Sequence, residues 1–544
     1  MAGAVQWIAE SVHEILQAPG LTLQTFVIFC LAFLLTCTLL RRSQNLPPYP
    51  AGRVPVLGHL LALGRAPHLK LTAWRRQYGD VFTVRMGMED VVVLNGYTAV
   101  KDALVDRSEL FASRPRIYML DSIAGDGKDM VAARWGPGFR QRKRFATIAL
   151  KNLGMKVGRG SIEDNIREEA NCLRSRVAEY EGQPFDFAHD VTVTVANVIC
   201  SMVFGKRYDY EDETFQELSK AVTAVVTELA AGQIISVFPA LRFVPGVNRA
   251  GTDLLQHVSK IHQVMWEEIS RRREHLHREN PRDFLDFCLL EIDQQDKVEG
   301  LTEENVMYMA MNLFLAGTET TGNTLLWALL YLTQNPAIQH KVHEELDAVV
   351  GASLPTLSHR SRLPYVNACL LETMRIRTLV PLAIPHSTTQ DVKVQKFDIP
   401  KGTQRVELEV GGAQSDEAEK AEVVKQTAVE EGGRPPALHE VGRQDKQLLE
   451  KIKEAVHIQL EGAKLNRNDG WELYMSYLPL LRKEVGRRVC LGEQLARMEL
   501  FLFFSCLLQS FTFNTPEGAP PPNTDGILGI TWTPNPYQLC ATPR

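Results

Sequence analysis

The sequence lacks most of the short motifs that mark common catalytic and binding sites. Its 544 residues contain no P-loop, no His-Glu-x-x-His pattern, no Cys-x-x-Cys pair and no internal repeat. Its 9 cysteines are odd in number and scattered, which argues against a disulfide framework or a zinc site and favours a reducing compartment. The formal net charge of -5 leaves no basic surplus, so the composition does not predict nucleic-acid binding.

Long uncharged runs are also scarce, and the longest lies near the N-terminus at residues 25–40. With residues 21–24 it reaches about 20 residues, enough to cross a bilayer as a helix. Two arginines follow it, whereas the preceding segment has two glutamates and neither Lys nor Arg. The positive-inside bias then predicts a retained signal anchor within residues 1–45, with the N-terminus in a lumen and the body in the cytosol. A buried core helix is the alternative interpretation.

The rest of the chain predicts one large helical domain. Residues 46–52 (LPPYPAG) predict a stiff linker, because consecutive prolines lock φ and lack donors. Strand-like runs follow at residues 81–85 and 91–94, and the pattern is then mostly helical and amphipathic to about residue 380. We therefore predict a mainly α fold with minor β, as a single domain over residues 46–544.

One helix is expected to be unusually long. Thr302 supplies a cap hydroxyl, two acids follow it, and the apolar pattern continues to Asn335-Pro336. At 1.5 Å per residue the helix would measure on the order of 50 Å, so it must cross the core.

The middle of this helix carries candidate catalytic residues. Ala316 and Gly317 remove side-chain bulk, and Thr320 can donate its hydroxyl to the carbonyl of Ala316 and bend the helix. We expect a polar notch in an apolar wall, where Glu319 feeds protons and Thr320 donates to bound oxygen. A kinked, solvated patch without chemistry is the alternative.

Cys490 stands in the loop GRRVCLG at residues 486–492, with glycines on both sides. Glycines leave room for a flat cofactor against bare backbone, and the apolar run at residues 495–504 predicts a buried helix whose N-terminus stabilises a thiolate. This geometry suits a haem iron with a thiolate ligand, which favours O–O cleavage. The alternative is an ordinary core cysteine, because free cysteine is among the most buried residue types.

A third motif completes a resemblance to a known family. Glu372 and Arg375 can pair on one helix face, although an exposed pair would contribute little stability. Together with AGTETT at residues 316–321 and the cysteine loop, this pair resembles the cytochrome P-450 superfamily, and the whole resembles a vertebrate microsomal family-2 member. The resemblance covers about residues 22 to 404 and 486 to 544.

The resemblance implies the cytochrome P-450 fold and a haem-thiolate monooxygenase. Such an enzyme inserts one atom of dioxygen into a lipophilic substrate (a fatty acid, steroid or xenobiotic) and reduces the other to water. The implied cofactor is haem b with Cys490 as axial ligand. Electrons would come from NADPH through a membrane-bound FAD/FMN reductase, with cytochrome b5 as a further candidate partner. The implied location is the endoplasmic reticulum membrane, the source of microsomes, with the catalytic domain facing the cytosol.

The resemblance also assigns roles around the cofactor. His386 and Arg488 would reach haem propionates, Gly486 and Gly492 would flank the ligand, and Glu372 with Arg375 would hold the scaffold on the cysteine side. Residues 379–386 are expected to form an apolar strand, broken by prolines, that lines the substrate pocket at Ile384.

A third propionate contact is expected from a helix over residues 134–145. Relatives carry Trp-Arg-x-x-Arg there, and this chain has Phe139, Arg140 and Lys143. Phenylalanine cannot donate a hydrogen bond, and lysine offers a point charge instead of a planar fork. We therefore expect looser propionate anchoring.

The resemblance stops between residues 405 and 484. This segment holds 12 Lys and Arg and 16 Asp and Glu in 80 residues, a higher charge density than the 23% of the whole chain. It lacks the aromatic, proline-rich meander of relatives, and Lys483 stands where they carry Phe. A second function class therefore stays open, an impaired remnant that acts at most as a membrane-bound interaction partner. Isomerase chemistry without external electrons is a third class, disfavoured because Glu319 and Thr320 are both present.

Overall fold

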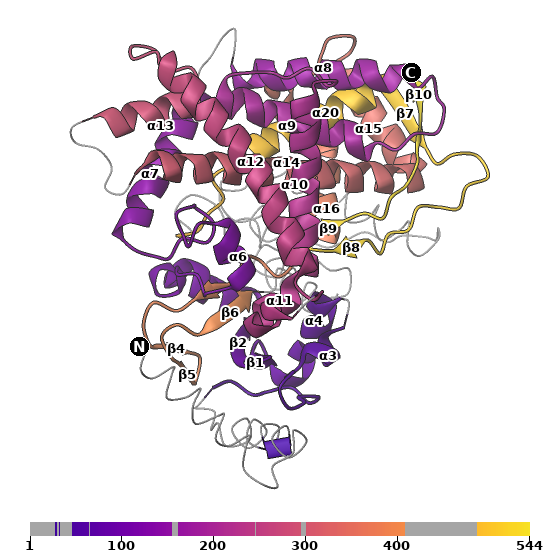
Figure 1. Ribbon diagram of the computed structural model, residues 1–544. Coiled ribbons are helices and arrows are strands. Elements are labelled where there is room, and N and C mark those ends of the chain that lie inside the picture. The colour runs from indigo at the N-terminus through magenta and orange to yellow at the C-terminus, as the bar shows by residue number, and fades with distance from the viewer. Residues whose placement is uncertain are drawn as a thin grey trace, which may run out of the picture.

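The computed structural model describes residues 28–29, 32, 46–64, 66–154, 161–244, 246–294, 301–407 and 487–544. Within these ranges a large helical body joins a smaller β-rich region (Figure 1), which confirms the predicted mainly α fold with minor β. Nearly all of the predicted anchor at residues 21–40 lies outside the described residues. Among the helices that are described, none has the length and apolar character needed to cross a membrane.

The helices precede and follow a long central one. Those before it are α3 (Leu60–Leu63), α4 (Pro67–Tyr78), α5 (Tyr97–Lys101), η1 (Asp102–Asp106), η2 (Ser108–Phe111), α6 (Tyr118–Ile123), α7 (Pro137–Gly154), α8 (Ile162–Glu179), α9 (Ala188–Phe204), α10 (Glu213–Ala231), α11 (Gln233–Val237), η3 (Pro239–Phe243), α12 (Arg249–Glu274) and α13 (Phe284–Asp293). The central helix and those after it are α14 (Glu303–Gln334), α15 (Pro336–Val349), η4 (Leu357–Arg362), α16 (Pro364–Ile376) and α20 (Glu493–Ser510).

The strands form one four-stranded sheet and three pairs. In the sheet the order is β1 (Val81–Met86), β2 (Glu89–Leu94), β6 (Gln404–Glu407) and β3 (His386–Ser387). The pairs are β4 (Val392–Val394) with β5 (Phe397–Ile399), β7 (Phe511–Asn514) with β10 (Cys540–Pro543), and β8 (Ile527–Leu528) with β9 (Trp532–Thr533). The two predicted strands are confirmed as β1 and β2. Strand β6 extends into the segment predicted to be atypical, so residues 405–407 still complete the sheet.

The proline-rich linker is attached to this sheet. The N–H of Thr83 in β1 donates to the carbonyl of Pro48 over 2.8 Å, and its hydroxyl donates to the carbonyl of Pro47 over 2.9 Å. The ring of His59 contacts the carbonyl of Pro50 at 2.9 Å. The chain therefore enters the domain along a fixed path.

The long helix is confirmed as α14, a 32-residue helix in the middle of the body (Figure 1). Thr302 caps it, because its side chain accepts from the N–H of Asn305 and the Asn305 side chain accepts from the N–H of Thr302. The helix packs against α9, α12 and α20. Most of its side chains are buried, which explains why its apolar pattern extends around the whole helix instead of following one face.

Two local predictions were wrong, both near prolines. The helix expected over residues 134–145 is α7, which begins at Pro137 and ends at Gly154. A proline disfavours helical backbone in the preceding residue and suits the first turn itself. The expected strand over residues 379–386 forms only at His386, in β3, because Pro381 and Pro385 have no N–H for a ladder.

Helices α14 and α20 meet through buried apolar surface with one polar contact among the described hydrogen bonds. The hydroxyl of Thr321 in α14 donates to Oε2 of Glu499 in α20 over 3.1 Å. Glu499 is 1% exposed, and Oε1 has no hydrogen-bond partner among the described residues. Burial raises the pKa of Glu499 from its ordinary 4.5 to about 8, and the Thr321 hydrogen bond opposes this only in part.

This carboxyl group makes stability depend on pH. Because its pKa is higher in the folded chain, the folded state binds more protons than the unfolded state between about pH 4.5 and pH 8. We expect the free energy of unfolding to fall across this window as pH rises, by an amount on the order of 5 kcal/mol. Glu499→Gln should remove this contribution, which urea unfolding at both ends of the window would measure. Glu344→Gln, an exposed acid of α15, is the control, and an equal effect of both variants would refute the assignment.

Candidate functional site

Cys490 lies at the start of α20, as predicted, with Gly492 as the N-cap of that helix. Its side chain is exposed to a probe, yet burial is the largest influence on its pKa, which is raised. Both observations hold when a thiol lines an enclosed recess instead of the outer surface. A Cβ placed on Gly492 would meet no atom within 4 Å, so space is open beside the loop on that side as well.

The surroundings of the sulfur favour the thiolate, although burial outweighs them. The backbone N–H groups of Gly492 and Glu493 and the charge of Lys143 all lower the pKa of Cys490. Such N–H groups at a helix N-terminus are anion donors. A thiol that coordinates a metal ion loses its proton outright, so ligation would override the effect of burial.

Arg488 joins the cysteine loop to two other loops. Its guanidinium donates to the carbonyls of Ala112 over 2.8 Å and Met130 over 3.3 Å, and also to that of Ala133. The same group lies 3.8 Å from the centre of the Phe139 ring. Burial and the nearby Arg114 lower the pKa of Arg488, but a guanidinium stays protonated in proteins. The site therefore holds a buried positive charge.

Lys143 adds a second cation beside it. Its ammonium donates to the carbonyl of Arg487 over 2.8 Å. Burial, then repulsion from Arg488, lowers the pKa of Lys143 to about 8, and Arg114 contributes in the same direction. Among the described groups that act on Lys143, Cys490 alone raises its pKa. A ligand with two carboxylates and a metal would relieve both the cationic repulsion and the cost of a buried thiolate, so this donor set fits a haem.

The loop at residues 111–114 brings His386 to the same place. The His386 ring is buried, and its Nδ1 contacts the carbonyl of Phe111 at 2.8 Å. Arg114 follows in this loop, is 7% exposed, and donates to the carbonyls of Ile384 over 2.7 Å and Pro385 over 3.0 Å. Arg114 was missed from the sequence, because a single arginine in a loop has no diagnostic spacing. Its proximity to Lys143 and Arg488 emerges only from the tertiary structure.

Two predicted cofactor residues are not part of this group. Arg140 is exposed, its guanidinium lies over the ring of Trp135 at 5.6 Å, and it is not among the charges that shift the pKa of Lys143 or Arg488. Gly486 lies outside the described residues. The structure thus gathers His386, Lys143 and Arg488, together with Arg114.

The notch predicted in α14 is present. The hydroxyl of Thr320 donates to the carbonyl of Ala316 over 2.8 Å, as expected, and Ala316 is exposed within a mostly buried helix. Gly317 serves a different purpose than predicted: a Cβ there would lie 2.6 Å from Cδ1 of Ile199. The glycine therefore permits close packing of α14 on α9, and Ala316 alone opens the notch. Glu319 lies beside it, with burial raising the pKa of its carboxyl group.

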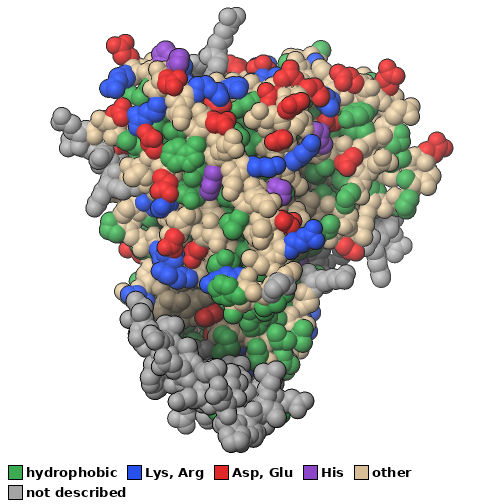
Figure 2. Space-filling model, in the orientation of Figure 1, with side chains coloured by type: hydrophobic (Ala, Val, Ile, Leu, Met, Phe, Trp, Pro, Cys, Tyr) green, Lys and Arg blue, Asp and Glu red, His purple; other side chains and the backbone are tan. Residues whose placement is uncertain are grey.

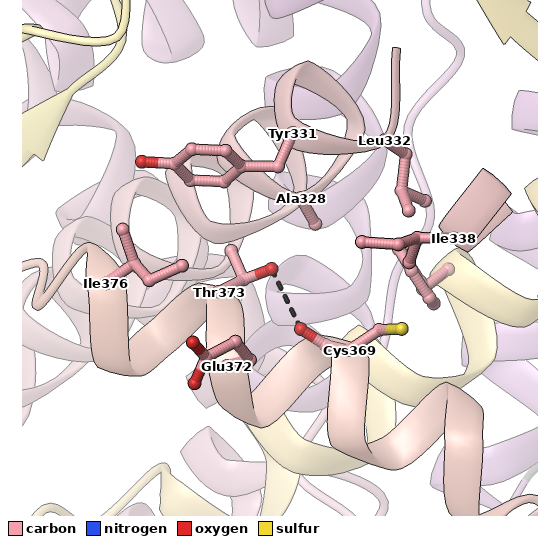
Figure 3. Close-up of a pocket in the computed structure, with 9 residues that line it drawn as sticks. Ala328, Tyr331, Leu332, Ile338, Cys369, Glu372, Thr373 and Ile376 are labelled. Carbon is pink, nitrogen blue, oxygen red and sulfur yellow. Dashed lines mark hydrogen bonds between the residues drawn. The ribbon is translucent and has the colours of Figure 1, made fainter. Parts of the chain in front are cut away.

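Glu372 and Arg375 pair as predicted, in two parallel hydrogen bonds of 2.6 Å. Both side chains are largely buried, which excludes the exposed pair of little value. Glu372 also lines a cavity of about 310 Å³ between α14, α15, α16 and α20 (Figure 3). The other lining residues are mostly apolar, and the Thr373 hydroxyl donates to the carbonyl of Cys369 over 2.9 Å. This cavity contains none of the groups around Cys490 and is a separate packing space.

Mainly helical architecture, a cysteine at a helix N-terminus and a cluster of buried cations define a haem-thiolate protein. The family model for cytochrome P450 matches residues 47–419 and 485–541. The part it leaves out, residues 420–484, lies inside the segment predicted to be unrelated.

Individual relatives agree with the family model. The chain is 34% identical to cytochrome P450 2D4 of Rattus norvegicus (96% of this chain, 99% of the relative) and 34% identical to cytochrome P450 2U1 of Bos taurus (94% and 87%). It is 32% identical to cytochrome P450 2J2 of Homo sapiens (96% of each). A zebrafish cytochrome P450 structure with progesterone superposes with a TM-score of 0.68 at 27% identity, covering 88% of this chain and 99% of that one.

The chain therefore belongs to the cytochrome P450 family, and its relatives are family-2 members. It is a cytochrome P450 monooxygenase, whose cofactor is haem-thiolate iron and whose electrons come from NADPH through a reductase. Dioxygen and a lipophilic substrate are the reactants of this family.

Haem retention should depend on Lys143. Lys143→Ala removes one charge from the cluster, and a charge-assisted hydrogen bond is worth about 1.5–3 kcal/mol, so haem loss should become roughly 10- to 100-fold faster. Lys143→Arg should slow it, because a planar fork can bind a carboxylate with two hydrogen bonds. Transfer of haem to excess apomyoglobin measures the rate. Lys151→Ala, at an exposed position of the same helix, should not change it, and unchanged loss in Lys143→Ala would contradict the role.

Proposed function

We propose that this monooxygenase hydroxylates a lipophilic substrate, with Cys490 as the axial thiolate. The observation that carries the proposal is the convergence of Cys490 with the buried cations Arg114, Lys143 and Arg488. When bound, a haem with a thiolate ligand supplies the activation of dioxygen that side chains cannot perform. For each turnover NADPH supplies two electrons. One oxygen atom enters a C–H bond of the substrate, and the other leaves as water with two protons.

The cations and the imidazole would hold the cofactor. Arg114, Lys143 and Arg488 would pair with the propionates, and His386, fixed by its Nδ1 contact with Phe111, would offer its second ring nitrogen to them. Glu372 and Arg375 would act at a distance, as a buried pair that keeps the end of α16 rigid on the cysteine side.

Proton delivery would depend on α14. Glu319 has a raised pKa because of burial, so it can hold a proton closer to neutral pH than an exposed glutamate. Thr320 already donates its hydroxyl to Ala316 and can turn it toward bound oxygen in the notch. Ala316 leaves the space in which this hydrogen bond would form.

An exposed apolar face supports association with the endoplasmic reticulum membrane. Hydrophobic side chains gather on the lower part of the described body (Figure 2), where Figure 1 places α3, α4 and α11. Leu61 is 71% exposed and Phe243 is 75% exposed, and Leu69, Val244 and Val247 are exposed as well. We propose that this face contacts the membrane while a signal anchor within residues 1–45 crosses it, with the body in the cytosol. Cytochrome b5 is proposed as a second electron donor beside the reductase.

The competing function, an impaired remnant, is favoured by one observation. The family model leaves out residues 420–484, where relatives carry the meander that would support the cysteine loop. A remnant would bind less than one haem per chain and show little turnover. A full complement of haem with NADPH-dependent product would exclude it, and product without NADPH would favour the isomerase alternative.

Cys490→Ser should abolish the thiolate-type spectrum of the reduced, carbon-monoxide-bound protein, because a neutral hydroxyl is a poor iron ligand. Cys506→Ser makes the same change in a buried thiol farther along α20 and should leave the spectrum intact. A thiolate-type spectrum in Cys490→Ser would mean that another cysteine is the ligand.

Thr320→Ala should leave haem binding unchanged but uncouple NADPH use from product, releasing hydrogen peroxide. Loss of one positioned proton donor typically costs about 100-fold or more in the step it serves. The ratio of peroxide to product measures the effect. Thr333→Ala, which removes a buried hydroxyl that bonds only within the same helix, is the control, and unchanged coupling in Thr320→Ala would refute the role of Thr320.

A further inference from the structure

Glu319 is tied to the C-terminal part of the chain through one amide group. Asn323, one turn later in α14, is 5% exposed. Its Nδ2 donates to Oε1 of Glu319 over 2.9 Å and to the hydroxyl oxygen of Thr533 over 3.1 Å. Thr533 is the last residue of β9 and lies 210 residues farther along the sequence. The amide thus bridges the candidate proton-delivering acid and a strand of a different part of the fold.

A second contact fixes the same face of α14 on the same strand. The indole N–H of Trp327, one turn after Asn323, donates to the carbonyl of Trp532 over 2.8 Å. The N–H of Trp532 in turn donates to the carbonyl of Leu379 over 2.7 Å. Residues 319, 323 and 327 are spaced four apart, so they lie along one face of the helix. The position of Thr533 relative to Glu319 is therefore held by more than its own hydrogen bond.

No charge competes with the amide for control of Glu319. Burial raises the pKa of Glu319, and the hydrogen bond from Asn323 is the one described interaction that lowers it. Charged or titratable side chains on neighbouring elements are Asp190 of α9, Glu499 of α20, and Arg377 and His68 around Trp532 beside β9. None of these four is among the causes of the shift.

An amide suits a partner that gains and loses a proton. Its NH₂ group donates to a carboxylate, and after a half-turn of the amide its oxygen accepts from the protonated acid. The hydroxyl of Thr533 can adapt in the same way, because it both donates and accepts. An aliphatic side chain can do neither, and an aspartate would repel the ionised form of Glu319.

We propose that Asn323 and Thr533 are positioning residues for proton delivery, in which Thr533 fixes the amide of Asn323 and Asn323 fixes the carboxyl group of Glu319 in both protonation states. This inference rests on the proposed role of Glu319. It assigns a function to the β8–β9 hairpin, which otherwise contributes no group to the site.

The test measures the pKa of Glu319 directly, in the haem-loaded, full-length protein. Infrared spectra recorded across a pH titration give the carboxylic acid band, which is assigned by its absence in Glu319→Gln. Asn323→Leu should move the midpoint upward by roughly one pH unit, because a donor to the ionised form is lost. Asn323→Asp should move it further, because two adjacent carboxyl groups cannot both ionise readily. Product formed per NADPH should fall roughly 10-fold in Asn323→Leu.

Thr533 provides the matched pair of variants. Thr533→Val keeps the shape but removes the hydroxyl, so it should shift the Glu319 midpoint in the same direction by a smaller amount. Thr533→Ser should restore the wild-type midpoint and coupling, which a purely structural role of the methyl group would not explain. Thr333→Val removes a buried hydroxyl elsewhere on α14 and should change neither.

The outcomes separate this inference from the proposed function. If Glu319→Gln uncouples turnover while Asn323→Leu and Thr533→Val leave the Glu319 midpoint and coupling unchanged, the positioning role is refuted and the role of Glu319 stands. If Glu319→Gln leaves coupling unchanged, both the role of Glu319 and this inference are overturned. Because Thr533→Val alters only the outer partner of the bridge, it decides the question even where Asn323→Leu destabilises the helix.

Discussion

The structure depends on how α14 is held against α20. These two helices carry the two halves of the site, the notch at Ala316 and the cysteine loop before Glu493, and they meet through apolar surface that contains the Thr321–Glu499 hydrogen bond. In such a contact the dispersion and hydrophobic terms supply most of the attraction but are not directional. The buried hydrogen bond is directional, and it fixes how far one helix can slide along the other. The spacing between the two halves of the site follows from that register.

The charges of the site make sense only as a set. Burial disfavours the ionised form of Cys490 and also the ionised form of Lys143, and each partly supports the other. Arg488 cannot lose its proton, so the protein surrounds it with backbone carbonyls and the face of Phe139. A chain without its cofactor thus keeps charged groups that its own residues do not fully neutralise. Such a site spends folding stability on binding capacity.

Local sequence signals predicted the long elements and most of the chemistry, because these depend on neighbours in the chain. The cap at Thr302, the i,i+4 bond of Thr320 and the i,i+3 pair of Glu372 all follow from helical spacing. The errors concern tertiary context: Gly317 faces Ile199 of another helix, Arg114 joins the cation cluster from a loop, and Asn323 meets a strand 210 residues away. No periodicity encodes such meetings.

Arg488 has a consequence for how the protein acquires its cofactor. Its hydrogen bonds to the carbonyls of Ala112, Met130 and Ala133 connect the cysteine loop to two loops far earlier in the chain. These bonds use protein atoms alone, so the loops are already aligned with one another before any ligand enters. Binding a rigid ligand to an ordered site costs less conformational entropy than folding the site around it. Maturation is then closer to the filling of a mould than to the assembly of one.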